Sequence, residues 1–408
     1  MPSKLTVPQP KEPSTLSNLP TGVWALGFVS MCMDTSSELV HSLLPAFMAV
    51  TLGAGMVTIG FVEGIAEATA AITKVFSGVL SDYWGKRKTL VVTGYGLAAF
   101  TKPIFPLASS ITWVLIARFV DRIGKGIRGA PRDALIADIT PEGQRGTAYG
   151  LRQSLDTVGA VVGPILAIAL MSSLAGKIRS VLWIGVIPAF VSVLLLIVAV
   201  REPSGRVSRS SSQTRLSARE VKRLGRAFWV IVSIGGILTL ARFSEAFLLL
   251  RAQDVGLPIA QVPVTLVIMN VVYAISSFPA GAAADRIDRR TLLSLGVGVL
   301  IVADLLLATA GSIPVVLAGV AVWGLHMGLT QGLLATLVAA AAPENLRGTA
   351  FGEFNLVSGG FLLLASVIAG SLWSVYGANA TFMAGGVFSA ITLIAFALCY
   401  SAVLPKAS

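Results

Sequence analysis

The chain has 408 residues, of which 55% are hydrophobic and 12% are charged, and its formal net charge is +11. A soluble domain carries about 25% charged residues, so water is excluded as the main solvent of this protein. The basic residues gather in short polar segments between apolar runs, as expected of a membrane protein oriented by its cytoplasmic positive charge. This placement argues against a nucleic-acid partner.

Apolar runs recur from Val23 to Val403, and each is long enough for an α-helix of about 20 residues to cross a bilayer. We therefore predict an all-α membrane protein with twelve transmembrane helices in contact with lipid. The segment 1–20 contains five prolines and predicts a disordered cytoplasmic tail. The expected spans are 22–50, 57–81, 88–107, 111–134, 146–172, 179–200, 228–252, 260–284, 291–311, 314–341, 348–373 and 378–402.

The segment 201–227 separates the sixth expected span from the seventh and carries eight Arg and Lys residues against Glu202 and Glu220. Because basic loops stay in the cytoplasm, we expect this linker, and with it both chain termini, to be cytoplasmic. The linker divides the chain into an N-terminal bundle over 21–200 and a C-terminal bundle over 228–404.

Two loop motifs occur once in each half of the chain. The segment 78–87, GVLSDYWGKR, recurs as GAAADRIDRR over 281–290, and 141–150, PEGQRGTAYG, recurs as PENLRGTAFG over 343–352. The offsets are 203 and 202 residues, which indicates two pseudo-symmetric halves of six spans. Duplicated halves around a midplane site are typical of transporters that alternate access by moving one half against the other.

The first of these motifs resembles the signature of the major facilitator superfamily, with a glycine, a spaced Asp, a second glycine and a basic cluster, and the resemblance covers essentially the whole chain. Tyr83 stands where the family usually has a basic residue, and Asp288 replaces the second glycine of the C-terminal copy. The resemblance implies the major facilitator fold and a cytoplasmic gate. The residues expected in that gate are Gly78, Asp82, Gly85, Lys86, Arg87, Asp285, Arg286 and Arg347.

The fifth span contains Gly150, Gly159 and then Gly163-Pro164, although Ala167 and Ile168 stand where further glycines are expected. This spacing resembles the signature of exporters in the twelve-span drug and proton antiporter branch, which implies efflux. The alternative is ordinary close packing of a membrane helix through small residues.

Ionisable residues inside a membrane span are functional candidates, because they are costly unless paired or hydrated. Asp34, Glu38 and His41 lie at i, i+4 and i+7 of the first span and therefore share one helical face. Glu63 and Glu67 repeat this spacing in the second span, where Glu63 fits a fixed ion pair or a place near the outer interface. The residues expected to exchange the coupling proton are Asp34, Glu38, Glu67, Asp121 and Glu245.

The fourth span carries a cationic stripe at steps of three or four residues, formed by Arg118, Arg122, Lys125, Arg128 and Arg132. Such a stripe favours an anion or forms a switchable network with the acids, and Arg152 and Asp156 form a pair that can neutralise part of it. The residues expected to line the substrate cavity are His41, Arg118, Arg122, Arg242, Asn270 and Tyr273.

These patterns predict a monomeric secondary active transporter, not an enzyme, in the plasma membrane, which in a bacterium is the inner membrane. Its leading function is proton-coupled efflux of a small organic molecule. The alternatives are transport of a transition metal ion, suggested by Met31, Cys32 and His41 beside the acids, or of a metal chelate, siderophore or organic anion. No cofactor or resident metal site is expected. A membrane-embedded enzyme is disfavoured, because the chain shows no recognisable metal-ligand set or nucleophile–base pair and because alternating access explains the twofold repeat with cavity charges better. A flux assay on reconstituted protein would distinguish a non-transporting receptor or scaffold.

Overall fold

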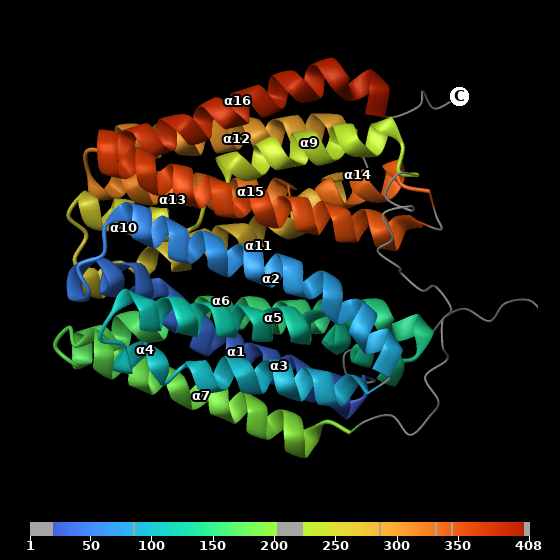
Figure 1. The fold of residues 1–408 in the computed structure, drawn as a ribbon, viewed down its shortest axis with the longest axis horizontal. Helices are drawn as coiled ribbons and strands as arrows, with labels where there is room; N and C mark the ends of the chain where they lie inside the picture. Colours follow the sequence, from blue (N-terminus) through green and yellow to red (C-terminus); the bar gives the residue numbers. More distant parts are fainter. Residues whose placement is uncertain are drawn as a thin grey trace, which may run out of the picture.

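The computed structural model describes residues 19–84, 86–201, 223–284, 287–330, 333–343 and 346–403, and these residues form helices and short connections (Figure 1). The helices of the N-terminal half are α1 (Thr21–Ala46), the π-helix η2 (Phe47–Thr51), α2 (Met56–Trp84), α3 (Arg87–Thr101), α4 (Ile104–Leu107), α5 (Ile111–Ile139), the 3₁₀ turn η3 (Glu142–Gln144), α6 (Arg145–Ser173) and α7 (Ile178–Ala199). Those of the C-terminal half are α9 (Arg226–Ala241), α10 (Ala246–Asp254), the 3₁₀ turn η4 (Ile259–Gln261), α11 (Val264–Ala284), α12 (Arg289–Thr309), α13 (Ile313–Thr330), α14 (Leu333–Ala341), α15 (Arg347–Tyr376) and α16 (Ala378–Val403).

The prediction of a multi-pass helical membrane protein is confirmed. Ten helical segments among the described residues are long and apolar enough to cross a membrane. The helices α1 and α5 have 26 and 29 residues, which is also long enough, but their charged side chains make them less apolar. The expected spans agree with the helices to within a few residues at most ends. The main differences are that α5 continues five residues beyond its expected end and that the seventh span is broken into α9 and α10.

Large apolar side chains cover the outer faces of the bundle, as lipid requires. On α7, Ile187, Leu194 and Val198 are each more than 60% exposed, and on α16 Ile394 and Leu398 are similarly open. Side chains of this kind are exposed to water only rarely in such large patches, whereas hydrocarbon solvates them at no cost. The outer surface formed by these side chains is therefore a lipid-facing surface.

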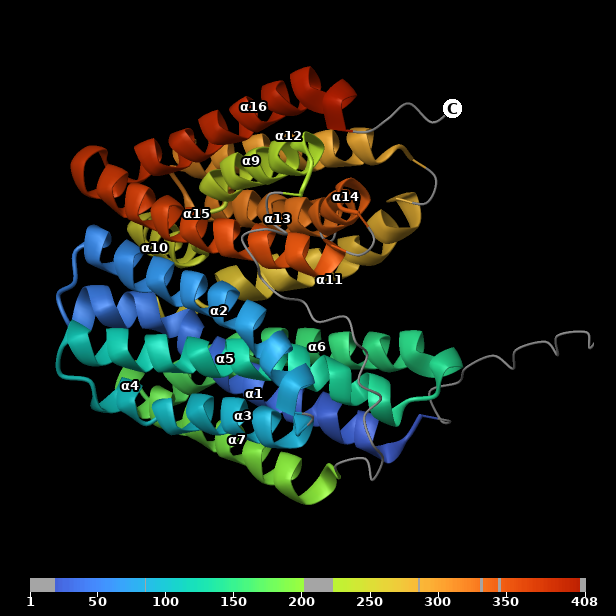
Figure 2. The ribbon, with the colours of Figure 1, turned by 45° about the vertical axis from the view of Figure 1, so that its right-hand side comes forward.

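The two halves repeat one packing arrangement (Figures 1 and 2). In the N-terminal half, α1 packs on α6 and α7, and α5 packs on α2 and α3. In the C-terminal half, α9 packs on α15 and α16, and α13 packs on α11 and α12 in the corresponding way. This correspondence is the structural form of the sequence repeat, and the two halves are pseudo-symmetric six-helix bundles.

The bundles meet along α2 with α15 and along α6 with α11. Near the start of α2, the backbones approach so closely that a Cβ atom on Gly60 would overlap the carbonyl group of Ser366, and one on Gly64 would lie 3.0 Å from Leu363. On the other side, Gly370 sits directly against the backbone of Met56. Glycine is required here because any side chain would separate the helices. The contact closes the end of the molecule at which α2 begins.

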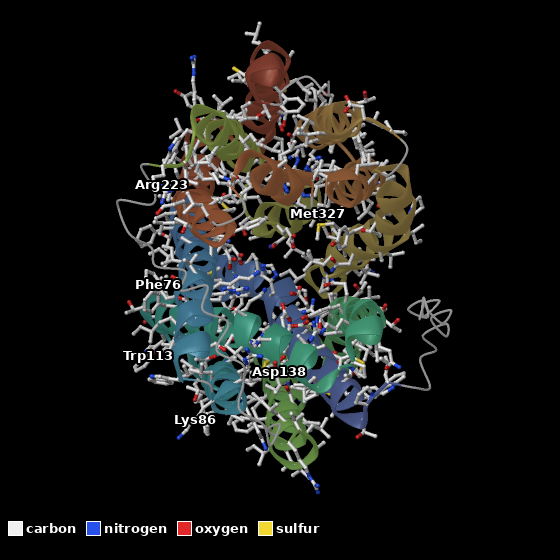
Figure 3. All side chains as sticks on the ribbon, turned by 90° about the vertical axis from the view of Figure 1, so that its right-hand side faces the viewer. Phe76, Lys86, Trp113, Asp138, Arg223 and Met327 are labelled. Atoms are coloured by element: carbon white, nitrogen blue, oxygen red, sulfur yellow. The ribbon has the colours of Figure 1, made fainter. Side chains whose placement is uncertain are left out.

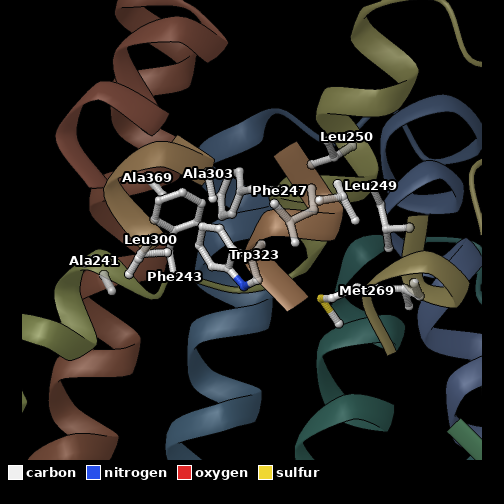
Figure 4. Close-up of a cluster of buried hydrophobic side chains, with 14 of the residues drawn as sticks. Ala241, Phe243, Phe247, Leu249, Leu250, Met269, Leu300, Ala303, Trp323 and Ala369 are labelled. Atoms are coloured by element: carbon white, nitrogen blue, oxygen red, sulfur yellow. The ribbon is translucent and has the colours of Figure 1, made fainter. Parts of the chain in front are cut away.

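An aromatic cluster fills the C-terminal bundle next to the break between α9 and α10 (Figure 4). Phe243 lies in the break, and its ring centroid is 5.6 Å from that of Phe247, 5.7 Å from that of Trp323 and 5.5 Å from that of Phe382. Such offset and edge contacts add to the area that the rings bury. The cluster therefore fixes the non-helical turn, although no proline or glycine occurs in it.

Replacing Gly60 by Leu should separate α2 from α15 and destabilise the protein by about 1–3 kcal/mol, the usual cost of overpacking. The matched control is Gly96→Leu in α3, where a Cβ atom would meet nothing within 4 Å. We expect a lower melting temperature for detergent-purified Gly60→Leu and a nearly native one for Gly96→Leu. Equal melting temperatures would show that the contact does not hold the two halves together.

Candidate functional site

A cavity of about 450 Å³ lies between the halves, bounded by α1, α2, α5 and α6 on one side and by α11 and α15 on the other. It occupies the part of the molecule toward the end of α2 and the start of α6, opposite to the closed end, and Figure 3 views the molecule from that side. Its volume falls in the usual range of small-molecule sites, about 300–1,000 Å³. The polar residues that line it are Asp34, Glu38, Glu67, Lys74, Lys125, Arg128, Arg132, Gln153, Asp156, Thr157, Asn270 and Tyr273.

A chain of ionisable groups leads from the cavity into the protein. Glu38 lines the cavity, and its Oε2 lies 3.6 Å from Nδ1 of His41, one turn further along α1. The other ring nitrogen, Nε2, lies 3.6 Å from Oε2 of Glu63 on α2. Glu63 is fully buried and forms an ion pair with Arg118 of α5. Three helices thus join one carboxylate at the cavity to a second that has no contact with solvent.

The inner end of this chain reaches the other half of the molecule. The hydroxyl of Ser244 lies 3.5 Å from Oε2 of Glu63, and Ser244 stands in the turn between α9 and α10. The same hydroxyl accepts a hydrogen bond from the backbone N–H of Ala246, the first residue of α10. Glu63 Oε1 has no hydrogen-bond partner among the described residues. The broken span therefore places a polar group of the C-terminal half on the buried carboxylate.

A second buried ion pair lies beside the first. The ammonium group of Lys102, between α3 and α4, lies 2.9 Å from Asp121 Oδ1 on α5 and donates to the Ser37 hydroxyl at 3.0 Å. Only 2% of the Lys102 surface is exposed. A fully desolvated ammonium is stable only with such partners, since burying an unpaired charge is very costly. Lys102 and Asp121 therefore form a fixed link between the third and fourth spans.

Toward the open side, arginines of α5 connect α1 and α6. Arg128 Nη2 lies 4.0 Å from Asp34 Oδ1, and its guanidinium lies 4.6 Å from the centre of the Tyr95 ring. Arg132 lies 3.9 Å from Asp156 of α6, which itself accepts a 2.9 Å hydrogen bond from Arg152. The pair expected within the fifth span is thus present and neutralises part of the cationic stripe.

The structure separates the expected proton-exchanging acids into two groups. Asp34, Glu38 and Glu67 line the cavity. Asp121 instead points to Lys102, and Glu245 lies in the turn that precedes α10. Of the five acids expected to exchange the coupling proton, Asp121 is thus already paired with a buried lysine.

Two of the six residues expected to line the substrate cavity are in its lining. Asn270 and Tyr273 of α11 line the cavity, and Asn270 Nδ2 donates to the carbonyl of Ala160 at 3.2 Å. His41, Arg118 and Arg122 are at least 93% buried behind the wall instead, because acids of α1 and α2 hold them there. Arg242 caps the end of α9 in the break and is absent from the lining.

Most of the expected gate residues lie outside the described part of the chain. Gly85, Asp285 and Arg286 are among them, and the side chains of Asp82 and Arg347 and the surroundings of Gly78 are likewise outside it. Lys86 precedes α3 and is exposed. Arg87 pairs with Asp138 and donates to the carbonyl of Ala134, so it joins the start of α3 to the end of α5.

The glycines of the fifth span have different environments. A Cβ atom on Gly159 would lie 2.6 Å from the Met31 carbonyl, and one on Gly163 would lie 2.7 Å from the Thr35 carbonyl, so both glycines bring α6 onto α1. Pro164 is buried in the same face. Gly150 faces open space and takes no part in this packing, contrary to expectation. The contact sets the position of Asp34 and Glu38, which flank it on α1.

Sequence reasoning overlooked four charged residues or gave them too little weight. Glu63 is the centre of the buried chain, and Lys74 lines the cavity. Lys102, which stands next to a proline at the end of an apolar run, pairs with Asp121. Asp304, in the middle of the apolar segment of α12, is fully buried, and its carboxylate oxygens have no hydrogen-bond partner among the described residues. Its position inside an apolar run was a sufficient signal.

Within the described ranges, the structure brings together no group of three His, Cys, Asp or Glu side chains that could hold a metal ion.

Comparison with known proteins decides the family. The model of the Major Facilitator Superfamily matches residues 26–250 and 234–408. The chain belongs to the major facilitator superfamily. It is 32% identical to an uncharacterized MFS-type transporter of Methanocaldococcus jannaschii, over 92% of this chain and 94% of that protein. It is 25% identical to the inner membrane transport protein YajR of Escherichia coli, over 91% of this chain and 81% of that protein.

A solved structure shares the fold of this major facilitator protein. It is a bacterial homologue of the human lysosomal transporter Spinster in an inward-facing and occupied conformation, with a TM-score of 0.76, 16% sequence identity, and coverage of 94% of this chain and 97% of that chain. At this identity the likeness shows the fold alone. The family match makes this chain a membrane transporter of the major facilitator superfamily. The shared fold agrees with the fold that the loop motifs predicted.

Replacing Glu63 by Gln should strongly destabilise the protein, because it leaves the buried Arg118 without a counter-charge. Loss of one partner of a buried pair costs about 3–5 kcal/mol. The control is Glu67→Gln: Glu67 faces the cavity with 34% of its side chain exposed, and its partner Arg122 also lies 3.9 Å from Asp121, so the loss of Glu67 should cost about 1 kcal/mol or less.

Thermal unfolding in detergent measures both effects. The double variant Glu63→Leu with Arg118→Met removes both charges and should recover much of the lost stability. If Glu63→Gln melts no lower than Glu67→Gln, Arg118 has another counter-charge and the assignment of the buried pair is wrong.

Proposed function

We propose that this protein is a proton-coupled secondary transporter that exports a small organic molecule by alternating access. The observation that carries the proposal is the chain from Glu38 through His41 to Glu63, which joins the cavity to a carboxylate shared by both halves of the molecule. Imidazole is suited to pass a proton between two carboxylates, because its two nitrogens can face one each. A proton that enters at the cavity can thus change the charge at the contact between the halves.

The proposed orientation places the cavity mouth and both termini in the cytoplasm. The cavity lies toward the end of the molecule where α7 ends and α9 begins, and the connections at this end carry Lys86, Arg87, Lys88, Arg145 and Arg201 (Figure 1). Basic connections stay on the cytoplasmic side of a membrane. The structure then corresponds to an inward-facing state, with the opposite end closed by α2 and α15.

Alternating access follows from the unequal ends of the interface. Glycine contacts hold α2 to α15 at one end, whereas a cavity separates the halves at the other. Rocking one bundle against the other closes the cavity and opens the glycine contact, as in other repeat-built transporters. The export direction rests on the Gly159 and Gly163-Pro164 spacing of α6, which resembles that of the proton-driven exporters. The close α1–α6 contact made by these glycines holds Asp34 and Glu38 at the cavity wall.

Replacing Glu38 by Gln keeps the shape of the side chain but fixes it in a neutral form. We expect proteoliposomes with this variant to exchange solute down its own gradient but to lose accumulation driven by a pH gradient. The solutes tested are a mixed panel of organic acids, amines, sugars and nucleosides, and the solutes that the native protein accumulates are then followed in the variant.

The control is Asp254→Asn. The side chain of Asp254 is 46% exposed at the end of α10 and is not part of the cavity lining, so this variant should accumulate solute as the native protein does. Native accumulation by Glu38→Gln would remove Glu38 from the coupling path. If the native protein transports solute equally well with and without a pH gradient, proton coupling itself is refuted.

A further inference from the structure

The charged groups that line the cavity are not equally paired. Each lining acid has a basic side chain within 4.0 Å: Asp34 has Arg128, Glu38 has His41, Glu67 has Arg122, and Asp156 has Arg132 and Arg152. The two arginines beside Asp156 also contact Asp133, so that group is balanced within itself. The acids are thus occupied by the protein's own cations.

Two lysines differ from this pattern. Lys74 of α2 and Lys125 of α5 line the cavity, both are exposed in it, and neither has a carboxylate within 4.0 Å among the described residues. An ammonium carries three hydrogen-bond donors and no acceptor, so an anion is its natural ligand. The two lysines therefore contrast with the lining acids, each of which has a partner of opposite charge.

The local structure brings the two lysines to one wall. Gly126 lets α5 approach α2 so closely that its Cβ would lie 3.0 Å from the backbone nitrogen of Lys74. Gly129, one turn beyond Lys125, leaves room for the Lys74 side chain, whose Cγ and Cε would lie 4.0 Å from a Cβ there. Glycines on α5 therefore give Lys74 a path along the helix on the same face as Lys125.

The opposite wall belongs to the C-terminal half. Asn270 and Tyr273 of α11 and Leu362 of α15 line it, and alanines of α2 and α6 complete the apolar part of the surface. A ligand held here therefore meets cations on one side and neutral polar and apolar groups on the other. A small molecule with one anionic group and a compact apolar body fits both walls.

Resting on the proposed transport function, we infer that the substrate is a small organic anion, a carboxylate or a phosphate ester, whose charged group binds Lys74 and Lys125. The binding links the N-terminal half to α11 and α15 through the body of the ligand. A cationic substrate is disfavoured, since each acid in the wall that could bind it already has an arginine or histidine partner, which the substrate would have to displace.

Binding to purified protein in detergent tests the inference without any gradient. The probes share one ring and differ in charge: benzoate, phenyl phosphate, benzamide and benzylammonium. A ligand that binds the folded state raises its melting temperature. We expect both anions to raise the melting temperature, and benzamide and benzylammonium to leave it unchanged. Added salt should weaken the effect of the anions. A larger effect of phenyl phosphate than of benzoate would identify a phosphate ester, and the reverse a carboxylate.

Variants assign the effect to the two lysines. Lys125→Gln and Lys74→Gln should each weaken anion binding about tenfold or more, the usual loss for one charge-assisted hydrogen bond. Lys125→Arg keeps the charge and should retain binding, and Lys177→Gln, in the exposed connection between α6 and α7, serves as the control. The melting temperature without ligand shows whether each variant is folded.

The results separate this inference from the proposed coupling. Equal effects of the four probes, no effect of either anion, or native anion binding by both glutamine variants would overturn it. Stronger binding of benzylammonium would make the substrate a cation. If the lysine variants lose anion binding while Glu38→Gln keeps gradient-driven accumulation, the anion site stands and the coupling path fails.

Discussion

The structure depends on the pairing of charges that the N-terminal half buries away from water. Arg118 with Glu63 and Lys102 with Asp121 lie almost wholly inside the protein, where an unpaired charge costs several kcal/mol even after relaxation. Each pair joins two helices and fixes their relative rotation. With α2, α3 and α5 held in this way, Lys125, Arg128 and Arg132 of α5 line the cavity.

The two halves use the same helix arrangement but different chemistry. The repeat offset of 202 residues places Trp323 of α13 at the position of Asp121 in α5. Trp323 packs against Phe243 in the aromatic cluster, whereas Asp121 holds a buried ammonium. The C-terminal half is therefore held together by apolar contacts around its broken span, and it supplies only a few polar groups to the site, such as Ser244, Asn270 and Tyr273. The N-terminal half supplies the charges.

Hydropathy and the internal repeat were sufficient to predict the helices and the family, because a bilayer permits few other structures for long apolar runs. The same information could not find the break at Arg242–Glu245, which depends on aromatic packing between residues far apart in the sequence. It also could not tell which acids share the cavity. Asp121 and Glu38 look alike as intramembrane acids, and only the position of Lys102 across a helix interface separates their roles. Helical periodicity specifies the face of one helix but not its neighbour.

The placement of the ion pairs bears on how the halves can move. The pairs around the cavity join helices of the N-terminal half to one another, so a rocking motion of the bundles leaves them intact. What crosses between the halves is weaker: glycine contacts along α2 and α15, a hydrogen bond from Asn270 to the Ala160 carbonyl, and the 3.5 Å contact of Ser244 with Glu63. None of these separates a buried charge from its counter-charge when it breaks. Under the proposed coupling, a small change at Glu63 would therefore shift the conformational equilibrium, and His41 is the side chain that lies between that carboxylate and Glu38 at the cavity.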